Sequence, residues 1–441
     1  MKLLYLAHRI PYPPNKGEKI RAYHQVRYLA QRHTLDLACL IDDPRDRAHV
    51  EPLKQLCRQV HAQTIRPLPA KARGLLAQLL GSSVSVGYFH RPALQKVVDR
   101  WLAETAYDAV VCFSSTMAEY VFRSPLLDGT PRPRLIIDFC DVDSDKWRQY
   151  AATARFPLKL IFRREHRRMQ HYEQRIHQAF DGTVLVSPQE AELFAAQVGS
   201  REKMTVIPNG IDANVFDPRL TVADSLPRQP DVPLLVFTGA MDYHANVDGV
   251  LWFCNEVLPL VRLSHPQVQF KIVGSNPTAA VQKLAERHGI EVTGFVADVR
   301  PYYAMADVCV APLRLGRGVQ NKVLEAMAME RAVVATSSAN AGIAAKSGAH
   351  LLVADSPGGF AVAVNELLKD ASSRQHLGRA ARRFVIANFD WNKALAGFEA
   401  LLAGPSLPAS VLAQQAAPAA PTAAKKPATR RARSKSAGGP A

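Results

Sequence analysis

Short apolar runs alternate with longer segments of helical spacing along the first half of the chain. Apolar runs of strand length, separated by helical segments, are typical of a parallel, doubly wound sheet. The predicted strands are residues 2–7, 35–41, 108–113, 135–138, 182–186 and 204–207. The predicted helices are residues 20–31, 46–59, 75–80, 93–104 and 187–197, together with a strongly basic helix over 155–175.

A second series of the same kind begins at Leu234, after a polar, proline-bearing segment at 221–232 that we interpret as a linker. Its predicted strands are residues 234–239, 269–274, 291–296, 308–311, 332–336 and 351–354. Its predicted helices are residues 247–258 with Asn246 as N-cap, 278–288, 298–305, 321–329, and further helices up to Phe384.

The length of 441 residues exceeds what one core usually supports, so we predict two doubly wound α/β domains. A last amphipathic helix is expected over 387–402. The segment beyond Gly404 is rich in Pro, Ala, Lys and Arg, which predicts a disordered tail. The predicted boundaries are a first α/β domain at 1–215, a linker at 216–233, a second α/β domain at 234–385, a last helix at 386–403 and the tail at 404–441.

Candidate chemistry concentrates after the predicted strand 308–311. A glycine-bearing loop there carries Arg314 and Arg317, and the helix that follows begins with Asn321 and Lys322. Free NH groups at a helix start attract anions, and the added cations indicate a phosphate or diphosphate. Glu325, one turn further, is placed to accept hydrogen bonds from a sugar hydroxyl. The alternative is that the arginines are simply solvated and that Glu325 stabilises the helix start without a ligand.

Two further glycines follow predicted strands. Gly17 lies in the loop after residues 2–7, with Lys19 and Arg21 close by, and Gly239 ends the strand 234–239. Ligands of open α/β sheets bind at the carboxyl ends of strands, so both glycines are candidate cradles for a phosphate or a sugar. An ordinary strand-to-helix turn with solvated charges explains Gly17 equally well.

Three aspartates, Asp141, Asp143 and Asp145, follow the predicted strand 135–138. Paired carboxylates at a strand end suit a divalent cation on a nucleotide diphosphate. Aspartates also serve as ordinary turn and N-cap residues. Because no further acidic cluster accompanies them, no metal site is predicted.

The segment 155–175 holds seven Lys and Arg residues against Glu165 and Glu173, with an apolar flank at its start. A basic helix of this kind suits an anionic membrane surface, or it is an exposed helix whose apolar residues pack on the sheet. The net charge of +16, six of it beyond Gly404, favours an anionic partner of some kind. Nucleic acid is not expected, because no aromatic stacking platform or nucleic-acid motif accompanies the charge.

The apolar runs and the cysteines indicate the cellular compartment that we expect for the protein. No apolar run is long enough to span a bilayer, and the one at the N-terminus is too short for a signal peptide. The six cysteines form no CxxC pair, which argues against zinc and agrees with a reducing compartment. We therefore expect a cytoplasmic protein, peripheral at the inner face of the plasma membrane if the basic segment binds lipid.

Four segments together resemble the GT-B glycosyltransferases, most closely the retaining family 4 group. These are VIPNGID at 206–212, FTGAMDYHANVDGVLWF at 237–253, VTGFVADVRPYYAMADVCVAPLR at 292–314 and GRGVQNKVLEAMA at 316–328. Their details look like the sugar transferases of PEP-CTERM/exosortase exopolysaccharide loci. The resemblance implies two Rossmann-like domains facing a cleft, an acceptor-side domain at 1–215 and a nucleotide-sugar-binding domain at 234–385, with a C-terminal crossover helix at 386–403.

The resemblance also implies roles for individual residues. Glu325 would bind the ribose of the donor, Lys322 would grip its diphosphate, and both would act in catalysis together with Arg317. Donor-binding positions would be Gly239, Asp242, Gly294, Phe295, Val296, Arg314, Gly318, Val319, Gln320 and Asn321. Acceptor-side positions would be Gly17, Lys19 and Arg21.

Two departures from the family pattern affect the donor site. Arg317 stands where the family usually has a glutamate that meets the donor sugar. The loop after Gly239 carries Asp242 and uncharged neighbours in place of the usual Arg and Lys. Arg314 and Arg317 are expected to supply the missing positive charge, with geometry suited to phosphate.

The function implied is transfer of a sugar from a nucleotide-diphosphate-sugar to a glycan or lipid-linked acceptor, with retention and without a metal or other cofactor. Fixed cations and helix NH groups would stabilise the leaving diphosphate. A nucleotide-sugar epimerase has a related architecture and would act on the donor alone. A degenerate transferase that only binds glycan or lipid is the other alternative, favoured by the loss of the glutamate at 317.

Overall fold

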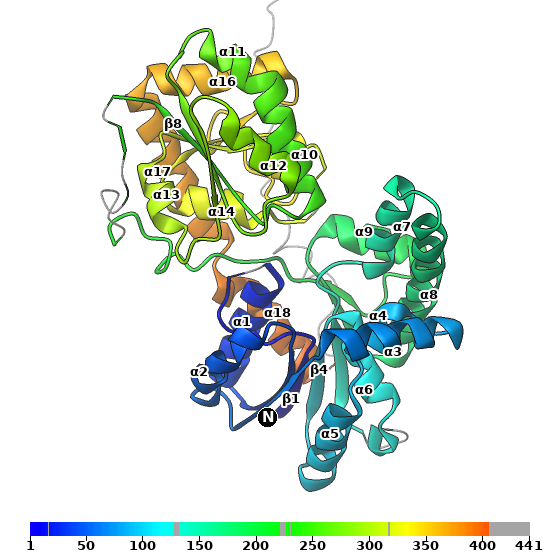
Figure 1. The fold of residues 1–441 in the computed structure, drawn as a ribbon. Coiled ribbons are helices and arrows are strands. Elements are labelled where there is room, and N and C mark those ends of the chain that lie inside the picture. Colours follow the sequence, from blue (N-terminus) through cyan, green and yellow to red (C-terminus); the bar gives the residue numbers. More distant parts are fainter. Residues whose placement is uncertain are drawn as a thin grey trace, which may run out of the picture. The chain divides into compact units, whose positions relative to one another are not determined.

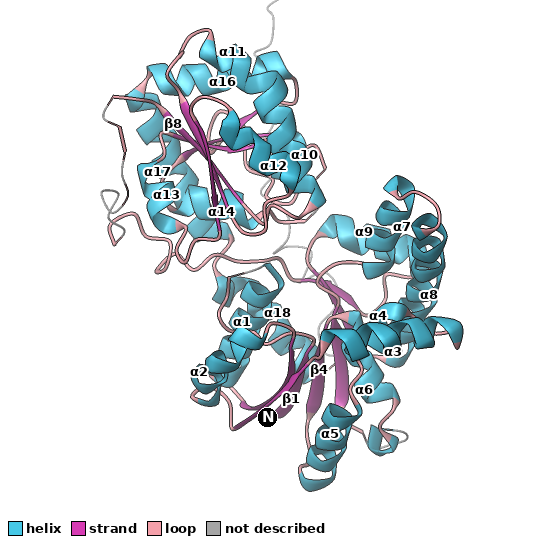
Figure 2. Cartoon of the chain, in the orientation of Figure 1, coloured by secondary structure: helices cyan, strands magenta, loops and turns pink. Residues whose placement is uncertain are grey.

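The computed structural model describes residues 1–15, 17–127, 132–220, 226, 228–229, 231–315 and 318–404. Within them the chain forms two parallel sheets, one of seven strands and one of six, each flanked by helices (Figures 1 and 2). This confirms the predicted pair of doubly wound α/β domains.

The N-terminal sheet has the strand order β3-β2-β1-β4-β5-β6-β7. β1 and β4 at its centre read KLLYLA and AVVCF and are buried apart from Lys2, as expected for parallel strands covered on both faces. The strands are β1 (Lys2–Ala7), β2 (Thr34–Ile41), β3 (Gln59–Thr64), β4 (Ala109–Phe113), β5 (Arg134–Asp138), β6 (Gly182–Leu185) and β7 (Met204–Val206). The helices are α1 (Gly17–Ala30), α2 (Val50–Lys54), α3 (Pro67–Leu79), α4 (Val84–Phe89), α5 (Pro92–Glu104), α6 (Ala118–Phe122), α7 (Asp143–Thr153), α8 (Leu158–Ala179) and α9 (Pro188–Val198).

The C-terminal sheet has the order β10-β9-β8-β11-β12-β13, with β8 and β11 adjacent at its centre. Its strands are β8 (Leu234–Thr238), β9 (Gln269–Val273), β10 (Ile290–Gly294), β11 (Val308–Ala311), β12 (Ala332–Ala335) and β13 (Leu352–Val353). The helices are α10 (His244–Trp252), α11 (Leu258–Arg262), α12 (Ala279–Gln282), α13 (Arg300–Met305), α14 (Asn321–Ala328), α15 (Ser337–Asn340), α16 (Pro357–Lys369), α17 (Ala371–Asn388) and α18 (Trp391–Ala403).

The last helix, α18, packs on the N-terminal sheet. Trp391, Leu395 and Phe398 belong to one buried cluster with residues of β1 and β2. The ring of His24 in α1 stacks on Trp391, with 4.5 Å between centroids. The chain therefore ends its described part on the domain in which it began, as the predicted crossover helix requires.

Several predicted elements are wrong in detail. The helix predicted over 46–59 is a 3₁₀ turn, the short α2 and then the strand β3. The sequence of β3, QVHAQT, is half-buried throughout, so it lacks the apolar run that marks the central strands. The helix predicted over 278–288 divides into α12 and a 3₁₀ turn, and residues 387–388 belong to α17. No helix among the described residues has the length and apolar character needed to cross a bilayer.

Candidate functional site

The candidate site lies at the carboxyl edge of the C-terminal sheet, where the loops after β8, β9 and β10 are bonded to one another. Gly239 donates its backbone NH to the carbonyl of Val273 at 3.0 Å, and Gly274 donates to the carbonyl of Gly294 at 3.2 Å. Parallel strands end at a common edge, and ligands of such sheets bind there. The predicted donor-binding glycines 239 and 294 are thus brought together.

Two of these loops approach so closely that only glycine fits. A Cβ added to Gly274 would lie 1.7 Å from the carbonyl oxygen of Gly239. A Cβ on Gly239, whose φ is +155°, would lie 2.6 Å from Nδ2 of Asn246 and 3.2 Å from Cε of Lys322. The backbone of Gly239 therefore forms one wall of the space beside Lys322.

Lys322 lies in the first turn of α14, and its ammonium donates a hydrogen bond to Oδ1 of Asn246 at 3.0 Å. The ammonium also lies 5.5 Å from the ring centroid of Phe237. The side chain is half-buried, and this burial lowers the pKa of Lys322 to about 8, although Glu325 acts in the opposite direction. Among the described residues, no carboxylate forms an ion pair with this ammonium, so the cation is well suited to accept an anionic ligand.

A buried tyrosine that the sequence does not predict as part of the site forms a hydrogen bond with the carboxyl group of Glu325. Tyr303 is buried, and its hydroxyl donates to Oε2 of Glu325 at 2.8 Å. The same hydroxyl lies 2.6 Å from Oγ1 of Thr238, at the end of β8. Burial raises the pKa of Glu325, against the effects of the Tyr303 hydrogen bond and of Lys322. This fixes the carboxyl group one turn inside α14.

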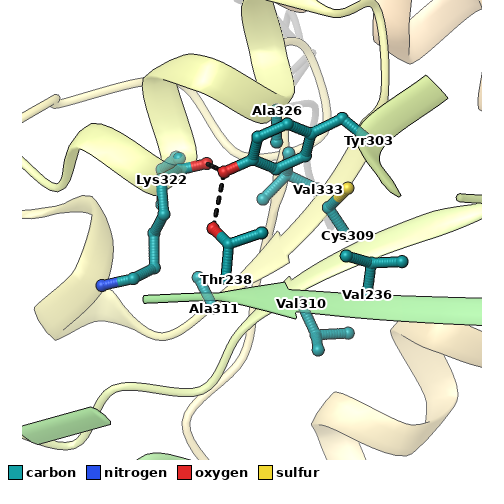
Figure 3. Close-up of a pocket in the computed structure, with 10 residues that line it drawn as sticks. Val236, Thr238, Tyr303, Cys309, Val310, Ala311, Lys322, Ala326 and Val333 are labelled. Carbon is teal, nitrogen blue, oxygen red and sulfur yellow. Dashed lines mark hydrogen bonds between the residues drawn. The ribbon is translucent and has the colours of Figure 1, made fainter. Parts of the chain in front are cut away.

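A cavity of about 10 Å³ lies beneath this group, lined by Thr238, Tyr303 and the stem of Lys322 among others (Figure 3). Figure 3 shows the ammonium of Lys322 pointing away from the Thr238–Tyr303 pair. A space of this size is near the minimum for one water molecule and is far too small for a nucleotide. The cavity is therefore a small packing gap beside the Tyr303–Glu325 hydrogen bond. A nucleotide donor would have to bind outside it, over the loops that follow β8, β9 and β10.

Arg314 is not a free cation in this structure. Its guanidinium forms a two-pronged ion pair with Asp248, with Nε 3.0 Å from Oδ2 and Nη2 2.5 Å from Oδ1. It also lies 6.0 Å from the ring centroid of Trp252 and lines an open hollow of about 310 Å³ with Ser337 and Asp355. Direct binding of phosphate by Arg314 would require this pair to open.

The remaining predicted donor positions differ in burial and in backbone conformation. Gly318 adopts φ +63°, Val319 is buried, and Gln320 and Asn321 are half-buried at the start of α14. Gly294 also has a positive φ, and Phe295, next to Val296, is exposed. Asp242 is exposed and accepts a hydrogen bond from Asn276. Arg317, predicted as catalytic, lies outside the described residues.

Asn246 is not the N-cap of its helix, and that prediction is wrong. α10 already begins at His244, with Tyr243 in the capping position. The side chain of Asn246 is buried inside the helix, where Nδ2 donates to the carbonyl of Ala240 at 2.8 Å and Oδ1 accepts from Lys322. It thus links the loop after β8 to the ammonium of Lys322.

The two predicted acceptor-side cations form ion pairs inside the N-terminal domain. Arg21 is fully buried and pairs with Asp138, at 2.7 Å from Nη2 to Oδ2, and it also donates to Asn209. Lys19 is buried and pairs with Asp46 at 2.6 Å. Lys19 and Arg21 therefore neutralise carboxylates within their own domain, and their acceptor-side role stays a prediction. Gly17 is exposed at the first position of α1, and its role stays a prediction.

The aspartates after β5 behave as residues of a helix start. Asp143 accepts a hydrogen bond from Ser115 at 2.5 Å, and Asp145 accepts from Arg148 and Gln149 of its own helix, α7. Burial raises the pKa of Asp141 and of Asp143. Within the described part of the chain, no group of three or more His, Cys, Asp or Glu side chains is arranged to hold a metal ion.

A cluster of polar side chains also lies at the carboxyl edge of the N-terminal sheet, and the sequence does not predict it. His8 follows β1 and stacks on Phe113, with 5.8 Å between centroids. Arg9 beside it pairs with Glu18 and with Asp42. Burial and the charge of Arg9 lower the pKa of His8 to about 4, so this imidazole is neutral at physiological pH.

Two family models together match most of the chain. The model described as "Glycosyl transferase 4-like domain" matches residues 16–210, and the model described as "Glycosyl transferases group 1" matches residues 232–370. The boundary between them falls between the two sheets.

Two curated proteins illustrate the sequence similarity. An "Uncharacterized 44.6 kDa protein in cps region" of Klebsiella pneumoniae is 22% identical over 409 residues, which is 89% of this chain and 97% of that protein. A "GDP-mannose-dependent alpha-(1-6)-phosphatidylinositol monomannoside mannosyltransferase" of Mycolicibacterium smegmatis is 27% identical over 248 residues, covering 52% of this chain and 64% of that enzyme.

Solved structures show the same two-domain architecture. Sucrose-phosphate synthase from Thermosynechococcus elongatus superposes with a TM-score of 0.65 at 19% identity, over 91% of this chain and 98% of that one. Anabaena HepE in complex with UDP superposes with a TM-score of 0.61 at 15% identity, over 91% of this chain and 100% of that one. At these identities the likeness concerns the fold.

Proposed function

We propose a specific reaction for this chain, which belongs to the GT-B glycosyltransferases of the family 4-like group. The enzyme moves a sugar from a nucleotide-diphosphate-sugar to a glycan or lipid-linked acceptor and retains the anomeric configuration. The proposal depends mainly on one observation: Lys322 presents a half-buried ammonium at a helix start, beside a glycine-built wall.

The leaving diphosphate would be stabilised by fixed groups of the C-terminal domain. The ammonium of Lys322 and the backbone NH groups at the start of α14 supply positive potential where negative charge develops during bond cleavage. Asn246 holds the ammonium in position before the ligand arrives, so little reorganisation is needed. No metal is required by this scheme, because the neutralising charge belongs to the protein.

The ribose of the donor would be bound by Glu325. Its carboxyl group is fixed by the hydroxyl of Tyr303, which leaves the second carboxylate oxygen to accept from a sugar hydroxyl. UDP in the complex of HepE supports a nucleotide as the ligand of this architecture. The base and the sugar that this chain selects are part of what the experiment below determines.

We assign the reaction to exopolysaccharide biosynthesis. The support is the relative from a cps region, which is matched over nearly its whole length. The link to PEP-CTERM/exosortase loci stays a prediction from motif resemblance. A lipid-linked acceptor would bring the enzyme to a membrane, and the basic helix α8 is the part of the N-terminal domain that we propose to meet an anionic membrane surface.

A donor screen tests the proposal. Melting temperatures are measured with UDP-, GDP-, ADP- and dTDP-sugars, with and without EDTA, for the natural protein and for Lys322→Met. A ligand that binds the native state raises the melting temperature by mass action. We expect one nucleotide class to stabilise the natural protein regardless of EDTA and to have little effect on Lys322→Met.

The stabilising donor is then incubated without and with glycan and polyprenyl-linked acceptors, and the products are analysed by mass spectrometry and NMR. Release of the nucleoside diphosphate with a new glycosidic bond supports transfer. Conversion of the donor to an isomer without an acceptor would instead show an epimerase. Stabilisation by no donor would overturn the proposed function and leave the binding-module alternative.

A further inference from the structure

α3 presents an apolar face to solvent. Leu68, Leu75, Leu76, Leu79 and Leu80 all lie exposed, and Leu68, Leu79 and Leu80 keep 80%, 83% and 77% of their surface accessible. Their spacing of three, four and seven residues puts them on one side of the helix, which we call the leucine face. The opposite side carries Ala70 and Gly74, which are buried.

The start of α8 carries further exposed apolar side chains. Phe156 is 79% exposed, and Leu158 and Leu160 are also exposed. Arg168 of α8 donates to the carbonyl oxygens of Gln78 and Ser82, so the C-terminal end of α3 is attached to α8 (Figure 1).

Basic side chains border these apolar groups, and acidic ones are absent from the same stretches of sequence. Residues 66–82 contain Arg66, Lys71 and Arg73 and no Asp or Glu. Residues 155–164 contain Arg155, Lys159, Arg163 and Arg164, again without an acid. All of these bases are exposed except Lys159, which is half-buried. The first acid of α8, Glu165, is buried and accepts hydrogen bonds from the start of α4.

We propose that the leucine face and the start of α8 form a docking surface for a bilayer that contains anionic phospholipids. Exposed leucines with a basic border match a helix that lies in the interface, with its apolar side among acyl chains and its cations at headgroups. A second copy of this chain would bring two basic borders together, and a glycan would leave the leucines in water. The surface thus deepens the proposed function, since it would hold the N-terminal domain where a lipid-linked acceptor lies.

Vesicle binding tests the docking surface without relying on catalysis. The full-length protein is sedimented with vesicles of phosphatidylcholine alone and of phosphatidylcholine with phosphatidylglycerol. We expect binding to the anionic vesicles, weakened at least tenfold by the pair Leu76→Glu and Leu79→Glu. The matched control is Leu263→Glu, which changes an equally exposed leucine of the C-terminal domain, 81% accessible, and should leave binding intact.

The same measurements distinguish membrane docking from self-association and from a failure of the donor site. Failure of the natural protein to bind anionic vesicles, equal binding to neutral vesicles, or unchanged binding of the leucine variant would each overturn the proposal. Self-association in solution that the leucine variant abolishes, without vesicle binding, would identify a second copy as the occupant. Thermal stabilisation by the donor should be the same in the variant and the natural protein, so failure of the membrane proposal is distinguishable from failure of the donor site.

Discussion

Lys322 gives a quantitative prediction about donor binding and pH. Burial lowers the pKa of Lys322 to about 8 in the ligand-free protein, whereas a diphosphate beside it would favour the charged form. The charged fraction of such a lysine falls from about nine-tenths at pH 7 to about one-tenth at pH 9. If binding requires the ammonium, the affinity for the donor should fall roughly tenfold over this interval.

Isothermal titration calorimetry at pH 7, 8 and 9 measures this dependence, with the nucleotide-sugar that stabilises the protein in the donor screen. Binding at pH 8 should also take up about half a proton, seen by comparing buffers of different ionisation enthalpy. Lys322→Arg is the matched control, because a guanidinium stays charged throughout. An equal fall in affinity in natural protein and Lys322→Arg would refute the reasoning, since it would locate the titrating group elsewhere.

The same pKa implies a stability cost in the absence of ligand. The folded state holds Lys322 with a lower pKa than the unfolded chain, so its charged form is penalised at pH 7, and the penalty is relieved as pH rises from 8 toward the ordinary lysine pKa. The shift corresponds to at most about 3 kcal/mol. Lys322→Met should therefore melt at a higher temperature than the natural protein at pH 7 while losing donor binding; a lower melting temperature would contradict the assigned burial cost.

Three further substitutions, one of them with a matched control, test the contacts that position the candidate site and the ion pair that stabilises the N-terminal domain. Tyr303→Phe removes the hydroxyl that donates to the carboxyl group of Glu325. If Glu325 binds the donor, KM for the donor should rise roughly tenfold, in line with about 1.5 kcal/mol for a buried hydrogen bond, with little change in Tm. An unchanged KM would argue against this role of Tyr303. Gly274→Ala places a methyl group 1.7 Å from the carbonyl oxygen of Gly239, so Tm and donor binding should both fall, and a variant that behaves like the natural protein in both would show that the loops are not so tightly joined. Arg21→Met leaves a buried carboxylate unpaired and should cost about 3–5 kcal/mol in urea unfolding. The exposed Arg27→Met should cost less than about 1 kcal/mol, and similar losses for both arginines would contradict the account.

The sequence predicts the central strands of both sheets well because they are short, apolar and buried, as in β1, β4, β8 and β11. It misses β3, whose QVHAQT sequence has no apolar run to distinguish it from a helix. The order of strands is a long-range property, since β1 lies between β2 and β4, and local periodicity carries no information about it.

The candidate site shows the same division between local and long-range information. Lys322 and Glu325 are predicted because a glycine loop before a helix is a local pattern. Asn246 and Tyr303 are missed as their partners because they reach the site from 76 and 22 residues away. The ion pair of Arg21 is not predicted for the same reason, since its partner Asp138 lies 117 residues later in the chain.

A crystal structure with bound nucleoside diphosphate would show directly whether Lys322 and the start of α14 hold the donor. We expect the diphosphate within hydrogen-bonding distance of the Lys322 ammonium and of the NH groups at the start of α14. We also expect the ribose against Glu325 and the backbone of Gly239 beside the ligand. A diphosphate bound away from Lys322, or bridged to the protein through a metal ion, would contradict the account.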